Sequence, residues 1–137
     1  MSLPTEPIGS IPRPQALIDG MQAFQAGFLS KPELDALRDA AVRETVQQLE
    51  QTGSPVISDG EQAKPSFATY PIQGLEHLAP EGVAIRFADG HVRQLPRLTA
   101  GPFRYKVYAV EYLTQARRYA HVPVKQAVIS ASALSLL

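Results

Sequence analysis

Two short segments carry residue types that could hold a small charged molecule. Gly9-Ser10 offers main-chain amides, which can donate to a carboxylate, and Asp59-Gly60-Glu61 ends in a carboxylate that can accept from an ammonium group. Together the two segments could bind one amino acid by its two charged groups. The alternative interpretation is that both are tight turns and that Glu61 is solvated.

Each of these segments lies at the end of a stretch that is expected to be extended, or directly after it. Residues 6–10 form a short extended piece in which Pro7 fixes one backbone angle and Gly9 permits close approach to the main chain. Residues 55–58 are short, apolar and rich in β-branched side chains, which predicts a buried strand. The candidate residues would then lie just after two strands.

Two helices are predicted between the two segments. Apolar residues spaced along one face predict a helix over 14–26 that stops at Gly27. The run Ser30-Lys31-Pro32-Glu33 has the pattern of a capping box with proline in the first turn. It predicts the start of a second helix, which carries its apolar stripe as far as Gly53.

The second half of the chain predicts a hairpin, a helix and a further strand. Apolar alternation from Val83 to Phe87 meets the turn signal Asp89-Gly90 and continues at Val92. Residues 105–119 have helical spacing, and residues 124–129 read as a third buried strand.

Strands that alternate with helices favour parallel pairing and an α/β fold. A (β/α)8 barrel needs about 250 residues. The 137 residues are therefore expected to form a single incomplete domain, the N-terminal portion of a (β/α)8 TIM barrel with a β-hairpin insertion, with the remainder after Leu137. No helix or strand is predicted for Met1-Ser2-Leu3.

Composition excludes several classes of function. Thirteen basic and thirteen acidic residues cancel without a basic block, so neither nucleic acid nor a membrane surface is expected as a partner. The chain has no cysteine, and its histidines lack the spacing of a metal site, so no metal is expected on these residues: His77, His91 and His121. No apolar run reaches the roughly 20 residues of a membrane span, and a cytoplasmic protein is expected.

Several motifs in order along the chain carry a resemblance to a known family. Pro4–Arg13 resembles the Thr-x-x-Ile-Gly-Ser-(Phe/Tyr)-Pro entry of the catalytic barrel of cobalamin-independent methionine synthase, and Gly53–Glu61 is similar to its second strand, which ends in Gly-Glu. Lys64 stands where that family usually has arginine, and Tyr70 where it has tyrosine. Pro123–Lys125 resembles the Pro-Val-Lys that opens its third strand.

The resemblance implies a zinc-dependent methyltransferase of methionine biosynthesis. In such an enzyme the thiolate of homocysteine, bound to zinc, attacks the N5 methyl group of a methyltetrahydrofolate. By analogy Ile8, Gly9 and Ser10 contact the substrate carboxylate through the main chain, and Glu61 takes the ammonium group. Four further residues are secondary candidates: Asp59, Lys64, Tyr70 and Arg93. The zinc ligands are expected outside this chain, which is expected to be inactive alone.

Two departures from the family pattern leave other functions open. Ser66-Phe67 replaces an Asp-Met pair, and Ile11 replaces an aromatic residue, so the thiol could be another one, such as coenzyme M. A different alternative is a small non-catalytic α/β module that self-associates through an exposed strand edge. A third is a catalytically silent relative that keeps only the fold.

Overall fold

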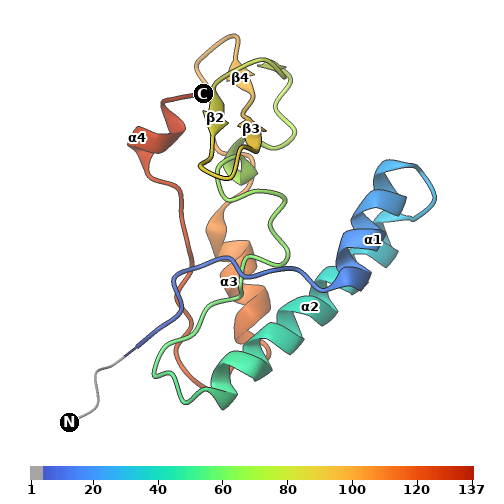
Figure 1. The fold of residues 1–137 in the computed structure, drawn as a ribbon, viewed down its shortest axis with the longest axis vertical. Helices are drawn as coiled ribbons and strands as arrows, with labels where there is room; N and C mark the ends of the chain where they lie inside the picture. Colours follow the sequence, from blue (N-terminus) through green and yellow to red (C-terminus); the bar gives the residue numbers. More distant parts are fainter. Residues whose placement is uncertain (1–4) are drawn as a thin grey trace. The chain divides into compact units, whose positions relative to one another are not determined.

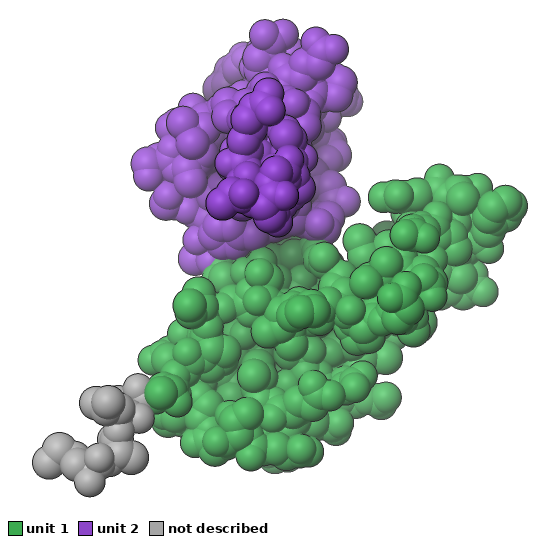
Figure 2. Space-filling view, viewed as in Figure 1, with its two compact units in different colours: residues 1–64, 109–127 green, residues 65–108, 128–137 purple. Residues whose placement is uncertain are grey.

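The computed structural model describes residues 5–137, so Met1-Ser2-Leu3 and Pro4 lie outside the described residues. The chain forms two compact units, coloured separately in Figure 2. Unit 1 joins the residues up to Lys64 with Ala109–Ala127, and unit 2 joins Pro65–Tyr108 with Val128–Leu137. Each unit is therefore built from two separate stretches of sequence.

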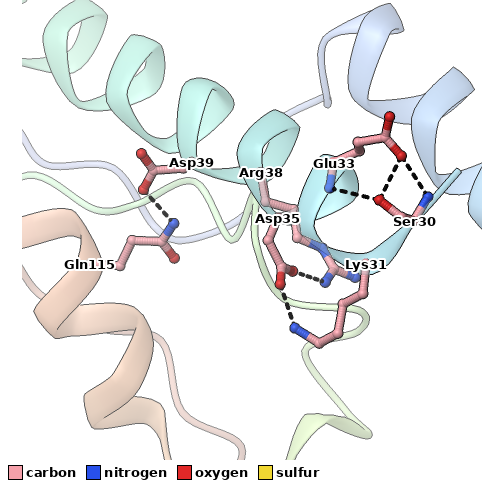
Figure 3. Close-up of polar contacts among 7 residues, drawn as sticks. All are labelled: Ser30, Lys31, Glu33, Asp35, Arg38, Asp39 and Gln115. Atoms are coloured by element: carbon pink, nitrogen blue, oxygen red, sulfur yellow. Dashed lines mark hydrogen bonds and ion pairs between the residues drawn. The ribbon is translucent and has the colours of Figure 1, made fainter.

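The first two helices of unit 1 confirm the predicted ones. Helix α1 spans Gln15–Gln25 and helix α2 spans Lys31–Gln51 (Figure 1). The capping box forms as expected: Ser30 Oγ accepts from the Glu33 amide at 3.4 Å, and Glu33 Oε2 accepts from the Ser30 amide at 2.8 Å (Figure 3). Both helices are followed by a glycine with positive φ, at Gly27 and Gly53, as the sequence predicts.

Two apolar clusters hold unit 1 together. Helices α1 and α2 pack through the buried side chains of Leu17, Leu34 and Ala41. The later turns of α2 pack with helix α3, which spans Ala109–Arg117, and with the segment around Ile57. The buried members of this second cluster are Val42, Val46, Ile57, Ala63 and Ala116.

A polar cluster also joins α2 to the region of α3. Asp39 accepts hydrogen bonds from the Tyr119 hydroxyl and from Gln115 Nε2, the latter at 2.9 Å (Figure 3 draws the Gln115 contact). These two hydrogen bonds, the one from Tyr119 first, lower the pKa of Asp39 below its usual value. The ionised carboxylate is therefore the form that the folded unit favours.

We expect Asp39→Ala to lower the free energy of unfolding by about 1 kcal/mol at pH 7, because the two donors lose a charged acceptor at a partly exposed site. The folded-state pKa is depressed, so this contribution is present above the unfolded pKa of 3.8 and is lost as pH falls through the lower folded pKa. Urea unfolding of both proteins at pH 7 and near pH 3 tests this, with Glu44→Ala on the same helix as the control. A difference between Asp39→Ala and the parent that does not shrink at acid pH would contradict the assignment.

The predicted parallel strands are reduced to one bridge. Ile57 pairs with Val124 in parallel: the Ile57 amide donates to Pro123 O at 3.0 Å, and the Lys125 amide donates to Ile57 O at 2.8 Å. Among the described residues no strand extends over 6–10, 55–58 or 124–129, so these three strand predictions are wrong in extent. The turn at Asp59-Gly60-Glu61 follows two residues after the bridge and ends the extended run.

Unit 2 contains two small antiparallel sheets. The predicted hairpin is confirmed: strand β2, Ala84–Arg86, pairs with β3, Val92–Gln94. Strands β1, Leu78–Ala79, and β4, Arg97–Leu98, form a second pair that was not predicted from the sequence. The unit also has a 3-10 helix η1, Tyr70–Ile72, and a short helix α4, Ala131–Leu134, whose first turn is capped by Ser130.

The third predicted helix begins later than expected. Its spacing predicts 105–119, whereas α3 starts at Ala109. The Lys106 amide donates to Pro71 O at 2.7 Å, so this part of the chain is bonded into unit 2 and does not enter the helix. The fold is thus mixed helix and strand, and the N-terminal portion of a TIM barrel stays a prediction. Within residues 5–137, none of the helices has both the length and the apolar character of a membrane span.

Candidate functional site

The candidate site is built around the turn that follows the Ile57–Val124 bridge in unit 1. Side chains fix this turn at both ends: Ser58 Oγ accepts from the Gly60 amide at 3.2 Å, and Asp59 Oδ1 accepts from the Glu61 amide at 3.0 Å. Ser58 Oγ also donates to Gly9 O at 3.3 Å. The first candidate segment is therefore bonded directly to the second.

Glu61 has an unusual backbone. Its φ is 56°, and it is the one non-glycine residue with positive φ among the described residues. The preceding Gly60 also has positive φ, at 61°. A left-handed non-glycine residue costs about 1–3 kcal/mol, and such strain clusters at binding and catalytic sites. Glu61 is also only 7% exposed, so the turn holds a carboxylate out of water.

Gly9 lies against the carboxylate of Glu61. A Cβ atom added at Gly9 would be 2.8 Å from Glu61 Oε1. The Ile11 amide donates to Gly60 O at 3.2 Å. It is a second hydrogen bond between the stretch that holds the first candidate segment and the turn, beside the one from Ser58 Oγ to Gly9 O. The two segments that the sequence singled out are thus brought together.

The other members of the first segment differ in exposure. Gly9 is buried, whereas Ser10 is exposed and the Ile8 side chain is 96% exposed. The exposed side chain of Ile8 is compatible with the main-chain contact that the resemblance implies for this residue.

Lys64 places a buried cation beside the turn. Its side chain is 1% exposed, its Nζ donates to Ala127 O at 2.6 Å, and Nζ lies 5.6 Å from the centre of the Tyr112 ring. Burial lowers the pKa of Lys64, while the charges of Asp59 and Glu61 oppose that shift.

Asp59 is oriented by a partner from the other bridged segment. Gln126 Nε2 donates to Asp59 Oδ2 at 3.1 Å. Asp59 and Gln126 each lie two residues after a member of the Ile57–Val124 pair, so they share one face of the two segments. With Oδ1 on the Glu61 amide and Oδ2 on Gln126, Asp59 holds the turn.

Arg13 was not predicted from the sequence, although it also holds this turn. Its guanidinium donates to three main-chain oxygens, those of Glu61 at 3.3 Å, Gln62 at 3.4 Å and Lys64 at 2.5 Å. Arg13 follows the Ile-Gly-Ser run by only three residues, but nothing in that spacing indicates that it reaches across to residues 61–64. Ser58 and Gln126 were missed for the same reason.

Two secondary candidates lie in unit 2. Tyr70 is buried in η1, and Arg93 Nη2 donates to Ser66 Oγ at 2.5 Å. The group gathered around Glu61 within unit 1 therefore contains Asp59 and Lys64 from the secondary candidates, and Tyr70 and Arg93 belong to the other unit.

The described residues do not form a metal site. In the part of the chain from Thr5 to Leu137, no group of three or more His, Cys, Asp or Glu side chains could hold an ion. His91 Nδ1 is 2.6 Å from Asp89 Oδ1 and its ring stacks on Phe87, while His121 Nδ1 is 3.0 Å from Glu50 Oε2. These residues therefore do not hold the zinc that the resemblance implies, whose ligands are expected outside this chain.

Comparison with solved structures finds a B12-independent methionine synthase from Shewanella sp. W3-18-1 in complex with selenomethionine, at a TM-score of 0.71 and 23% identity. The likeness is one of fold. It covers 97% of this chain and 39% of that one, so this chain spans well under half of its structural neighbour. A putative vitamin-B12 independent methionine synthase from Listeria monocytogenes matches at 24% identity and a TM-score of 0.45, over 52% of this chain and 22% of that one.

No protein-family model matches the sequence, and no curated protein matches it. The structural neighbours are thus methionine synthases at low sequence identity.

Proposed function

We propose that unit 1 carries the amino-acid-binding part of a methyltransferase site that acts on the thiol of homocysteine. In this proposal the main chain of Ile8, Gly9 and Ser10 receives the substrate carboxylate, and Glu61 receives its ammonium group. The observation that carries the proposal is the buried Glu61 carboxylate, held in a left-handed backbone against Gly9. The fold likeness to a methionine synthase supports it.

The acidic side chains of the turn provide acceptors for an ammonium ligand. Asp59 and Glu61 bring two carboxylates to the turn, beside the cations Lys64 and Arg13. A ligand ammonium group can donate a charge-assisted hydrogen bond to the Glu61 carboxylate. Coenzyme M has no ammonium group, so a buried glutamate favours homocysteine over that thiol.

The role of this part of the protein would be to position the substrate, since holding reactants in place supplies a large share of many rate accelerations. The folate methyl donor and the zinc belong to the proposal for the whole enzyme, with the zinc held by residues outside 1–137. The described residues lend no support to a self-associating module.

Glu61→Gln tests the proposal, because it keeps the side-chain shape and removes the charge. We expect it to weaken homocysteine binding to the full chain at least about tenfold, measured by calorimetry. The parent should also bind homocysteine more tightly than 4-mercaptobutyrate, which lacks the ammonium group.

Glu76→Gln, at an exposed acid in unit 2, is the control and should bind as the parent does. Equal affinity of Glu61→Gln and the parent, or a preference for 4-mercaptobutyrate, would refute the proposal.

A further inference from the structure

A pocket of about 270 Å³ lies within unit 2, and none of the residues assigned to the amino-acid site lines it. We refer to it as the unit-2 pocket. One wall comes from the β1–β4 pair and the residues beside it, His77 and Leu98, and the other from the segment Ala100–Lys106. Leu75 completes the lining.

Main-chain hydrogen bonds fix both walls of the unit-2 pocket. Leu78 pairs with Leu98, and the Thr99 amide donates to His77 O at 3.0 Å, so the strand pair continues up to the pocket. The Lys106 amide donates to Pro71 O at 2.7 Å, next to the buried residues of η1. The pocket is therefore formed before any ligand arrives, as small-molecule sites usually are.

The lining divides into an apolar part and a basic part. Leu75 and Leu98 are half-buried, and Phe103 and Tyr105 add two aromatic rings. His77, Arg104 and Lys106 also line the pocket, and all three are exposed. Among the described residues that line it, none is acidic. The lining therefore combines apolar and aromatic side chains with exposed basic ones.

We propose that the unit-2 pocket binds a small aromatic carboxylate, with the ring against Leu75, Leu98 and Phe103 and the carboxylate on Arg104 and Lys106. An arginine guanidinium matches the planar geometry of a carboxylate, and the charge of the lining is complementary to an anion. The volume lies just below the range of about 300–1,000 Å³ that is typical of drug-sized ligands, which suits a single ring with one charged group.

The proposal is tested by titrating the full chain with benzoate and following the backbone amides by NMR. We expect saturable shifts at residues of the pocket with a dissociation constant near or below about 1 mM, given the affinity per atom that small ligands reach. Benzamide keeps the ring without the charge, and acetate keeps the charge without the ring. Both should bind at least about tenfold more weakly.

The double variant Arg104→Gln/Lys106→Gln should weaken benzoate binding at least about tenfold. Arg86→Gln, which removes an exposed basic residue of the hairpin outside the lining, should leave it unchanged. Three results would overturn the proposal: no saturable shift with benzoate up to about 10 mM, equal binding of benzamide, or an equal loss in Arg86→Gln. Homocysteine binding at unit 1 is a separate measurement, so the two proposals can fail independently.

Discussion

Gly60→Ala is expected to lower the free energy of unfolding by about 3 kcal/mol. The φ of Gly60 is 61°, a conformation that costs an L-residue about 1–2 kcal/mol. A Cβ atom there would also lie 2.8 Å from Ile11 Cγ1 and 2.8 Å from Thr45 Cγ2. Thr45 is buried on α2 and cannot retreat freely, so overpacking adds about 1–3 kcal/mol.

Urea unfolding followed by circular dichroism measures this loss, and Gly53→Ala is its matched control. Gly53 has a φ of 73°, but no atom lies within 4 Å of the Cβ position. It should therefore show the conformational cost alone, about 1–2 kcal/mol. An equal loss of unfolding free energy in the two variants would mean that the close contacts at Gly60 do not contribute to the destabilisation.

Gly9→Ala is expected to weaken homocysteine binding about a hundredfold while changing the free energy of unfolding by less than about 1 kcal/mol. The new Cβ would be 2.8 Å from Glu61 Oε1, the far end of a flexible side chain that can move aside. The fold should therefore survive. The carboxylate, however, would leave the position in which it accepts from the ligand ammonium group, and the methyl group would also crowd the main chain that receives the ligand carboxylate.

A shorter acid at residue 61 provides the control for this mechanism. In the Glu61→Asp background, the carboxylate is drawn back from residue 9, so adding Gly9→Ala should cost little further affinity. Calorimetric titration of the parent, both single variants and the double variant forms a double-mutant cycle. Strictly additive losses would show that Gly9 acts without displacing the carboxylate of Glu61.

Helices α1 and α2 and the hairpin were predictable from the sequence because their signals are local. Ser30 and Glu33 are three residues apart, and both capping hydrogen bonds form between them. Asp89-Gly90 likewise places the turn between β2 and β3 without help from the rest of the chain. In each case the residues that make the bonds are the residues that carry the pattern.

The predictions that were wrong depend on partners distant in sequence. Residues 124–129 have an apolar pattern, but only Val124 finds a bridge partner. Residues 105–108 have helical spacing, yet the bond from the Lys106 amide to Pro71 O keeps them in a loop. Spacing along a segment contains no information about such bonds.

The candidate site was predictable in its residue types and not in its geometry. The sequence indicated Gly9 and Glu61 as a pair, but the positive φ of Glu61 follows from side chains that fix the turn from both sides. Arg13 donates hydrogen bonds to the main-chain oxygens of Glu61, Gln62 and Lys64. These contacts depend on the tertiary fold, so no sequence motif predicts them.

The way unit 1 is divided along the sequence sets the order in which it can form during synthesis. Helices α1 and α2 contain the local contacts and can pair as soon as they emerge from the ribosome. The hydrogen bond between Asp59 and Gln126 can form only after a further 67 residues have been synthesised. The one from Lys64 to Ala127 O requires a further 63 residues. Until then the turn lacks two of its partners, and a growing chain would expose acidic side chains whose binding geometry is not yet assembled.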